Sequence, residues 1–136
     1  MKDFTSDVKK IPYSADRVFA KLSDLNNIGS FQDALPPDKV SDLTFDTDSC
    51  SFKVEKIGTI SLRIVERDQG KTVKFVSEKS PVPFTLWIQL VEKASDDTRL
   101  KLTLRADIPF MLKGMVSKPL EDGIKKVADV FAALPY

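Results

Sequence analysis

The chain has 136 residues, of which 42% are hydrophobic and 30% are charged. This length and balance are typical of one folded globular domain, residues 1–136, and exclude the disordered class of proteins. The 21 basic and 20 acidic side chains leave a formal net charge of +1, so no global field favours nucleic acid as a partner. We therefore expect a single domain that does not bind nucleic acid.

The sequence also limits the compartment and the kind of site. It begins MKDFT and contains no apolar run that approaches the roughly 20 residues needed to span a bilayer. Cys50 is the single cysteine and histidine is absent, so neither an internal disulfide nor an ordinary zinc site is expected. We expect a cytoplasmic protein without integral membrane contact and without a metal ion.

The first third of the chain predicts one strand and two short helices. Residues 3–11 have the pattern of a strand. Ser14 follows as a helix N-cap, and the apolar spacing behind it predicts a helix that ends near residue 27. A second short helix, which carries Phe31, is expected before Pro36, because proline restricts the residue in front of it.

From residue 40 onward the hydrophobic period changes to two, which is the pattern of antiparallel strands separated by polar turns. We place six strands at 40–47, 49–56, 59–68, 71–79, 84–94 and 98–108. In the last one, Leu100, Leu102 and Leu104 share one face, and charged or threonine side chains share the other. A sheet with one apolar face needs a cover.

The final segment predicts that cover. A helix over 110–133 would be about 35 Å long, and Pro119 is expected to kink or restart it. Its apolar stripe contains Met111, Met115, Leu120, Ile124, Val127, Phe131 and Leu134. We expect this stripe to face the sheet.

Charged residues within the strands are interpreted as the solvated outer face of the sheet. They are Lys53, Glu55, Arg63, Glu66, Arg67, Lys74 and Glu78. Glu66 is also in phase with Ile60, Leu62 and Ile64, which makes it the one candidate for an inward carboxylate that could act as an acid.

Trp87 is open to two interpretations. Strict alternation places it on the outer face with Thr85 and Gln89. A register shift of one residue, caused by Pro81 and Pro83, would instead turn Trp87 into the wall of a cavity. An outward tryptophan would favour a partner surface.

Catalytic chemistry has little support in the sequence. The absence of histidine excludes the ordinary hydrolytic triads, and the isolated glycines do not have the spacing of a phosphate-binding loop. Cys50 alternates with Phe52 and Val54 and is interpreted as a small buried packing residue. We expect no cofactor and assign no catalytic residue.

The order strand, two short helices, six antiparallel strands and long terminal helix resembles the START-like or SRPBCC superfamily, which includes polyketide cyclase-like proteins. The resemblance is carried by residues 14–19 (SADRVF), by the strand pair within 84–108 and by residues 117–136. The ending is similar to that of small bacterial members. The resemblance implies an α+β helix-grip fold, in which a curved antiparallel sheet of six to seven strands surrounds the C-terminal helix.

The same resemblance implies a cavity between sheet and helix that usually holds a small hydrophobic molecule. The residues expected to line it are Phe31, Phe45, Phe52, Val54, Leu62, Ile64, Phe75, Ile88, Leu102, Leu104, Met111 and Met115. The competing interpretation is that these side chains simply fill the core. Binding of a small hydrophobic or amphipathic ligand is the leading hypothesis. A cyclase or dehydratase and a protein-interaction module that uses Trp87 or the Pro36-Pro37 elbow are the alternatives.

Overall fold

The computed structural model describes residues 2–30, 40–54, 58–80 and 82–136. Its strands are β1 (Lys2–Thr5), β2 (Lys9–Ile11), β3 (Val40–Phe45), β4 (Ser49–Val54), β5 (Gly58–Asp68), β6 (Thr72–Lys79), β7 (Phe84–Ala94) and β8 (Asp97–Ala106). Its helical segments are α1 (Ala15–Leu22), the 3-10 helix η1 (Leu25–Ser30), the 3-10 turn η3 (Phe110–Leu112) and α2 (Lys113–Ala133).

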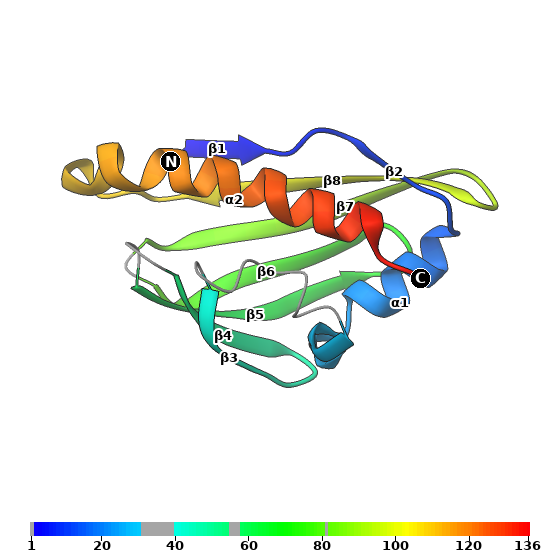
Figure 1. The fold of residues 1–136 in the computed structure, drawn as a ribbon, viewed down its shortest axis with the longest axis horizontal. Coiled ribbons are helices and arrows are strands. Elements are labelled where there is room, and N and C mark those ends of the chain that lie inside the picture. Colours follow the sequence, from blue (N-terminus) through cyan, green and yellow to red (C-terminus); the bar gives the residue numbers. More distant parts are fainter. Residues whose placement is uncertain (1, 31–39, 55–57, 81) are drawn as a thin grey trace.

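All the described strands form one antiparallel sheet. Its order is β1-β8-β7-β6-β5-β4-β3, and β2 pairs with β8 beyond the end of β1. α2 lies across one face of this sheet, while α1 and η1 lie at the end of the sheet opposite the start of α2 (Figure 1). The predicted α+β helix-grip fold, a curved antiparallel sheet with a long C-terminal helix, is confirmed.

The predicted first strand, residues 3–11, is two strands instead of one. Between β1 and β2, Ser6 donates its backbone N–H to the Leu102 carbonyl oxygen at 2.9 Å. The Ser6 hydroxyl accepts the N–H of Leu102, also at 2.9 Å. Ser6 is buried, so this side chain replaces a backbone acceptor where the strand leaves the regular ladder.

Ser14 caps α1 as predicted, because its hydroxyl oxygen accepts the N–H of Arg17 at 3.3 Å. The helix ends at Leu22, earlier than expected. Immediately after it, the Asp24 carboxylate accepts the N–H of Asn26 at 3.0 Å, which is a local turn that competes with helix continuation. The second predicted helix corresponds in part to η1, and Phe31 lies outside the described residues.

The six strands predicted after residue 40 correspond to β3 through β8, with ends that differ by a few residues. Because β8 pairs on both sides, its apolar residues lie at the centre of the core: Leu100 and Leu102 are fully buried and Leu104 is 5% exposed. α2 lies against β8, β1 and β2. A 2.6 Å ion pair between Lys9 of β2 and Asp129 of α2 ties these elements together.

α2 is one helix from Lys113 to Ala133 and contains Pro119, so the proline does not restart it. The chain after the helix returns to α1. The ring of Tyr136 packs edge to face on Tyr13 with centroids 5.7 Å apart, and its hydroxyl donates to the Phe131 carbonyl oxygen at 2.6 Å. Burial raises the pKa of the Tyr136 hydroxyl.

Candidate functional site

The inner face of the sheet, which faces α2, is tightly packed at the end where α1 lies. Ile11, Val18, Val73 and Leu100 each have no exposed surface there. They come from β2, α1, β6 and β8, so four elements converge on this part of the core. A closed core of this kind leaves no room for another molecule.

At the end of the sheet away from α1, the side chains of the inner face are only partly buried. Phe52 and Val54 at the end of β4, Ser77 near the end of β6, and Phe84 and Leu86 at the start of β7 are all partly exposed. Antiparallel pairing places these strand ends side by side. We call these five residues the open end of the inner face.

The predicted ligand-contacting residues divide into several groups. Leu62, Ile64, Phe75, Ile88, Leu102 and Leu104 are buried in the core. Phe52 and Val54 belong to the open end, and Phe45 is 37% exposed on the edge strand β3, opposite Cys50. Among the residues on the inner face, Phe52 and Val54 are therefore best placed to contact a molecule from outside, and the six buried residues form the core behind them.

Met111 and Met115 do not face the sheet, which corrects the start of the predicted stripe, whereas its later members Ile124 and Leu134 are buried as expected. The two methionines are 90% and 58% exposed, whereas Val116, one residue further, is 3% exposed. The stripe of α2 that meets β8 therefore passes through Val116, Ile124 and Ala128. The sequence is compatible with either Met115 or Val116 on the inward face, because the two are adjacent and either can begin a helical period of 3.6 residues.

Glu66 does not point inward either. The register between β5 and β6 shifts after Ile64, so Val65 is an extra residue and Glu66 pairs with Lys74. Lys74 in turn pairs with Trp87 on the outer face, and Glu66 is exposed. A β-bulge adds one residue to one strand and exchanges the two faces beyond it, which a strict count of alternation cannot foresee.

The same bulge explains Arg67, which was predicted to lie on the outer face. It pairs with the fully buried Val73 and therefore follows the inner face at the end of β5. Its guanidinium donates to the Ser23 carbonyl oxygen at 2.9 Å and to the Asp48 carboxylate at 2.7 Å. Arg67 thus joins the segment after α1 to the turn between β3 and β4.

Trp87 lies on the outer face, as simple alternation predicts. It pairs with Lys74 on β6 and Thr103 on β8, and its ring is half-buried between Lys74 Nζ, 5.8 Å from the centroid, and the Arg105 guanidinium, 5.6 Å away. Arg105 also donates to both carboxylate oxygens of Asp3, at 2.9 and 3.3 Å, and these hydrogen bonds lower the pKa of Asp3. The tryptophan is therefore partly covered by its own neighbours.

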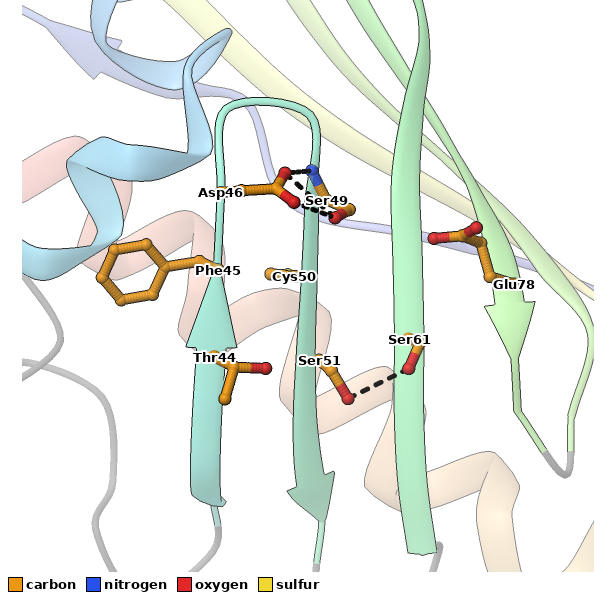
Figure 2. A pocket seen from close by; sticks show the side chains of 8 residues that line it. All are labelled: Thr44, Phe45, Asp46, Ser49, Cys50, Ser51, Ser61 and Glu78. Atoms are coloured by element: carbon orange, nitrogen blue, oxygen red, sulfur yellow. Dashed lines mark hydrogen bonds between the residues drawn. The ribbon is translucent and has the colours of Figure 1, made fainter.

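A shallow polar groove of about 230 Å³ lies on the outer face, and α2 is behind the strands in this view (Figure 2). Its lining residues are Thr44, Phe45, Asp46, Ser49, Cys50, Ser51, Ser61 and Glu78. Its polar groups bond largely to other groups of the protein. The Ser61 hydroxyl donates to the Ser51 hydroxyl at 3.0 Å, and the Glu78 carboxylate forms an ion pair with the neighbouring Arg63, with Nε and Oε2 3.4 Å apart. The polar side chains of this groove, on the β3–β4 hairpin and the neighbouring strands, therefore largely find their partners within the protein.

Asp46 stabilises the turn at one end of that groove. Its carboxylate accepts the backbone N–H of Asp48 at 2.9 Å. It also accepts the backbone N–H of Ser49, at 2.8 Å, and the Ser49 hydroxyl, as Figure 2 shows. These hydrogen bonds lower the pKa of Asp46, with the Asp48 N–H as the largest cause.

Cys50 is buried, as predicted, and burial raises the pKa of its thiol to about 12. A thiol that stays protonated is a poor nucleophile. Among the described residues, no group of three or more His, Cys, Asp or Glu side chains is arranged to hold a metal ion. No helix within the described ranges has the length and apolar character needed to cross a bilayer.

Solved structures with this fold cover nearly the whole chain. Norcoclaurine synthase from Thalictrum flavum superposes with a TM-score of 0.74 at 15% sequence identity, over 96% of this chain and 84% of that one. The same enzyme in complex with dopamine and hydroxybenzaldehyde gives a TM-score of 0.72, also at 15% identity and with the same coverage of both chains. A START superfamily protein from Mycobacterium smegmatis gives 0.65 at 11% identity, over 96% of this chain and 94% of that one.

No protein-family model matches the chain, and no curated protein sequence is significantly similar to it. At these identities the structural similarity establishes the fold and not the activity. The neighbours agree with the predicted START-like, SRPBCC-type architecture.

Proposed function

We propose that this protein binds a small hydrophobic or amphipathic molecule between the inner face of the sheet and α2, at the open end of the inner face. The observation that carries the proposal is the contrast in burial along that face. Val73 and Leu100 are fully covered, while Phe52, Val54 and Leu86 on the same face are not. Partly exposed apolar side chains that adjoin a closed core provide a contact surface for an apolar ligand.

The composition of the open end favours this class of ligand. Four of its five members, Phe52, Val54, Phe84 and Leu86, are apolar, and the fifth is Ser77. The Ser77 hydroxyl already accepts the N–H of Phe84 at 3.0 Å. A ligand would therefore place its apolar part here and keep a polar group towards solvent.

The structural neighbours support the same proposal. The norcoclaurine synthase complex holds dopamine and hydroxybenzaldehyde, which are small aromatic molecules, on a fold that covers 96% of this chain. The START superfamily protein has the same architecture. We transfer to this protein only the chemical class, a compact molecule with an apolar body.

The alternatives have less support. Glu66, the one proposed catalytic acid, is exposed on the outer face opposite Lys74. Trp87, one proposed docking surface, is partly covered by Lys74 and Arg105, and the other, the Pro36-Pro37 elbow, lies outside the described residues. Ligand binding is therefore the function that the arrangement supports best.

The test uses two neighbouring residues of β7 that lie on opposite faces. Leu86→Trp places an indole ring at the open end, and Thr85→Trp places the same ring on the outer face. Native mass spectrometry of the protein purified from its own host gives the mass of any bound molecule. We expect Leu86→Trp to lower the affinity for that molecule, or for the probe ANS, by at least about tenfold, because the larger side chain would occupy the space in which the ligand contacts the open end.

Thr85→Trp is expected to leave the affinity for the same molecule unchanged. Equal affinities of the two variants and the wild type would contradict the proposal, provided that their circular dichroism spectra agree. Loss of binding in both variants would also contradict it, because the site would then not be confined to the inner face.

A further inference from the structure

Three large apolar side chains in η3 and the first turn of α2 are exposed to solvent. Phe110 is 89% exposed, Met111 is 90% exposed and Met115 is 58% exposed. We call these three residues the apolar tip. Single exposed apolar residues are common on proteins, but three within six positions form a local patch, and patches of this kind mark contact surfaces.

The apolar tip lies at the same end of the molecule as the open end of the inner face. β7 begins at Phe84 and β8 ends at Ala106, two residues that pair with each other. Just beyond them, the N–H of Asp107 donates to the Pro83 carbonyl oxygen at 2.8 Å, and η3 follows with Phe110. The start of α2 is correspondingly at the end of the sheet away from α1 (Figure 1).

The charged residues within the stretch that carries the apolar tip are both basic. Residues 109–120 contain Lys113 and Lys118 and no acidic residue, and both lysines are exposed. The exposed Asp107 precedes this stretch, and from Glu121 onward residues of both signs follow along α2. Exposed apolar side chains interleaved with lysines are the pattern of a segment that lies in the interface of an anionic membrane.

We infer that the apolar tip inserts into the headgroup region of a bilayer that contains anionic lipids, with Lys113 and Lys118 at the phosphate groups. The long lysine side chains reach the headgroups while Phe110, Met111 and Met115 leave water. This inference rests on the proposed function and deepens it. With the apolar tip in the bilayer, the open end of the inner face would lie against the lipid surface. A hydrophobic ligand could then pass between the bilayer and the open end without crossing water.

Vesicle sedimentation tests the inference with a matched pair of variants. The triple variant F110S/M111S/M115S removes the apolar tip, and V65S/V91S removes exposed valines, 50% and 57% exposed, from β5 and β7. All five positions are exposed, so both variants should fold, and thermal unfolding checks this. We expect the wild type and V65S/V91S to bind vesicles of phosphatidylcholine and phosphatidylglycerol, and the triple variant to bind at least about tenfold less.

The charge requirement is tested separately. The variant K113E/K118E should lose the preference for phosphatidylglycerol over phosphatidylcholine alone, and added salt should weaken binding of the wild type. A wild type that does not sediment with either vesicle would overturn the inference. Equal sedimentation of the wild type and the triple variant would overturn it as well.

A fluorescent label reports the site of insertion directly. A cysteine introduced by Met111→Cys can be labelled selectively with an environment-sensitive dye, since Cys50 is buried and its pKa is raised to about 12. The emission should shift to shorter wavelength with anionic vesicles, and the label introduced by Val91→Cys should not respond. An unchanged emission at position 111 would contradict insertion of the tip.

Two further measurements separate the possible failures. Sedimentation equilibrium of the wild type without lipid shows whether the apolar tip instead joins two copies of the chain, an outcome that would overturn membrane docking. Affinity for ANS in the triple variant addresses the proposed function independently, because the tip residues are not part of the open end. Lost vesicle binding with retained ANS binding is the result we expect.

Discussion

Asp46 is the residue whose ionisation is tied most directly to a local structure. Its lowered pKa means that folding favours the ionised carboxylate, which accepts the N–H groups of Asp48 and Ser49. A carboxyl group whose pKa is lower in the folded state stabilises that state fully at a pH above its unfolded pKa, near 3.8. The stabilisation is lost as the pH falls through the lower pKa of the folded state.

We therefore predict that the free energy of unfolding decreases as the pH is lowered below about 4, and that Asp46→Asn shows a weaker decrease, because asparagine does not titrate. Urea unfolding of both proteins across this pH range is the measurement. Parallel pH profiles for the two proteins would show that the Asp46 turn does not contribute to the dependence.

Residues also show where sequence reasoning succeeds and where it does not. Ser14 and Cys50 were placed correctly because a cap and a buried alternating position depend on immediate neighbours. The inward stripe of α2 was assigned to Met115 instead of Val116, since either residue satisfies the helical period. The choice between them is made by the packing of α2 on β8, which no local pattern contains.

At the scale of elements, Arg67 connects parts of the chain that the sequence places far apart. Its guanidinium bonds to the Ser23 carbonyl oxygen and to Asp48, which belong to the segment after α1 and to the β3–β4 turn. Hydrogen bonds that involve a charged group contribute more than neutral ones, although partial exposure of Arg67 reduces the effect.

We predict that Arg67→Ala lowers the free energy of unfolding by roughly 1 kcal/mol. Arg63→Ala is the matched control, because Arg63 makes an exposed ion pair with Glu78 at 3.4 Å, and such pairs contribute little. Chemical denaturation of both variants decides the matter: a smaller effect for Arg67→Ala than for Arg63→Ala would contradict the assigned connection.

The β-bulge at Val65 accounts for the one wrong face predicted on β5, that of Arg67, and for the outward position of Glu66, which confirms its interpretation as part of the solvated outer face. Alternation was followed correctly up to Ile64, and both Glu66 and Arg67 then exchanged sides. The amino acids at the bulge, Ile64 and Val65, are ordinary strand residues and give no local signal for it. Bulges depend on the twist and register of the neighbouring strand, which are properties of the assembled sheet.

At the scale of the whole molecule, the order of elements was predictable because each segment has a strong period of its own. The six strands after residue 40 and the terminal helix follow from alternation and helical spacing. The open end of the inner face was not predictable, because burial there depends on where α2 lies across the sheet. α2 covers β8, β1 and β2, and leaves Phe52 and Leu86 partly exposed.

The central claim is that a small apolar molecule binds at the open end of the inner face. Methyl-detected NMR during titration with ANS tests it most directly, since valine and leucine methyl groups lie on both faces of the sheet. We predict that the signals of Val54 and Leu86 shift while those of the exposed Val65 and Val91 do not. Unchanged signals for Val54 and Leu86 at saturating ANS, or shifts confined to Val65 and Val91, would contradict the claim.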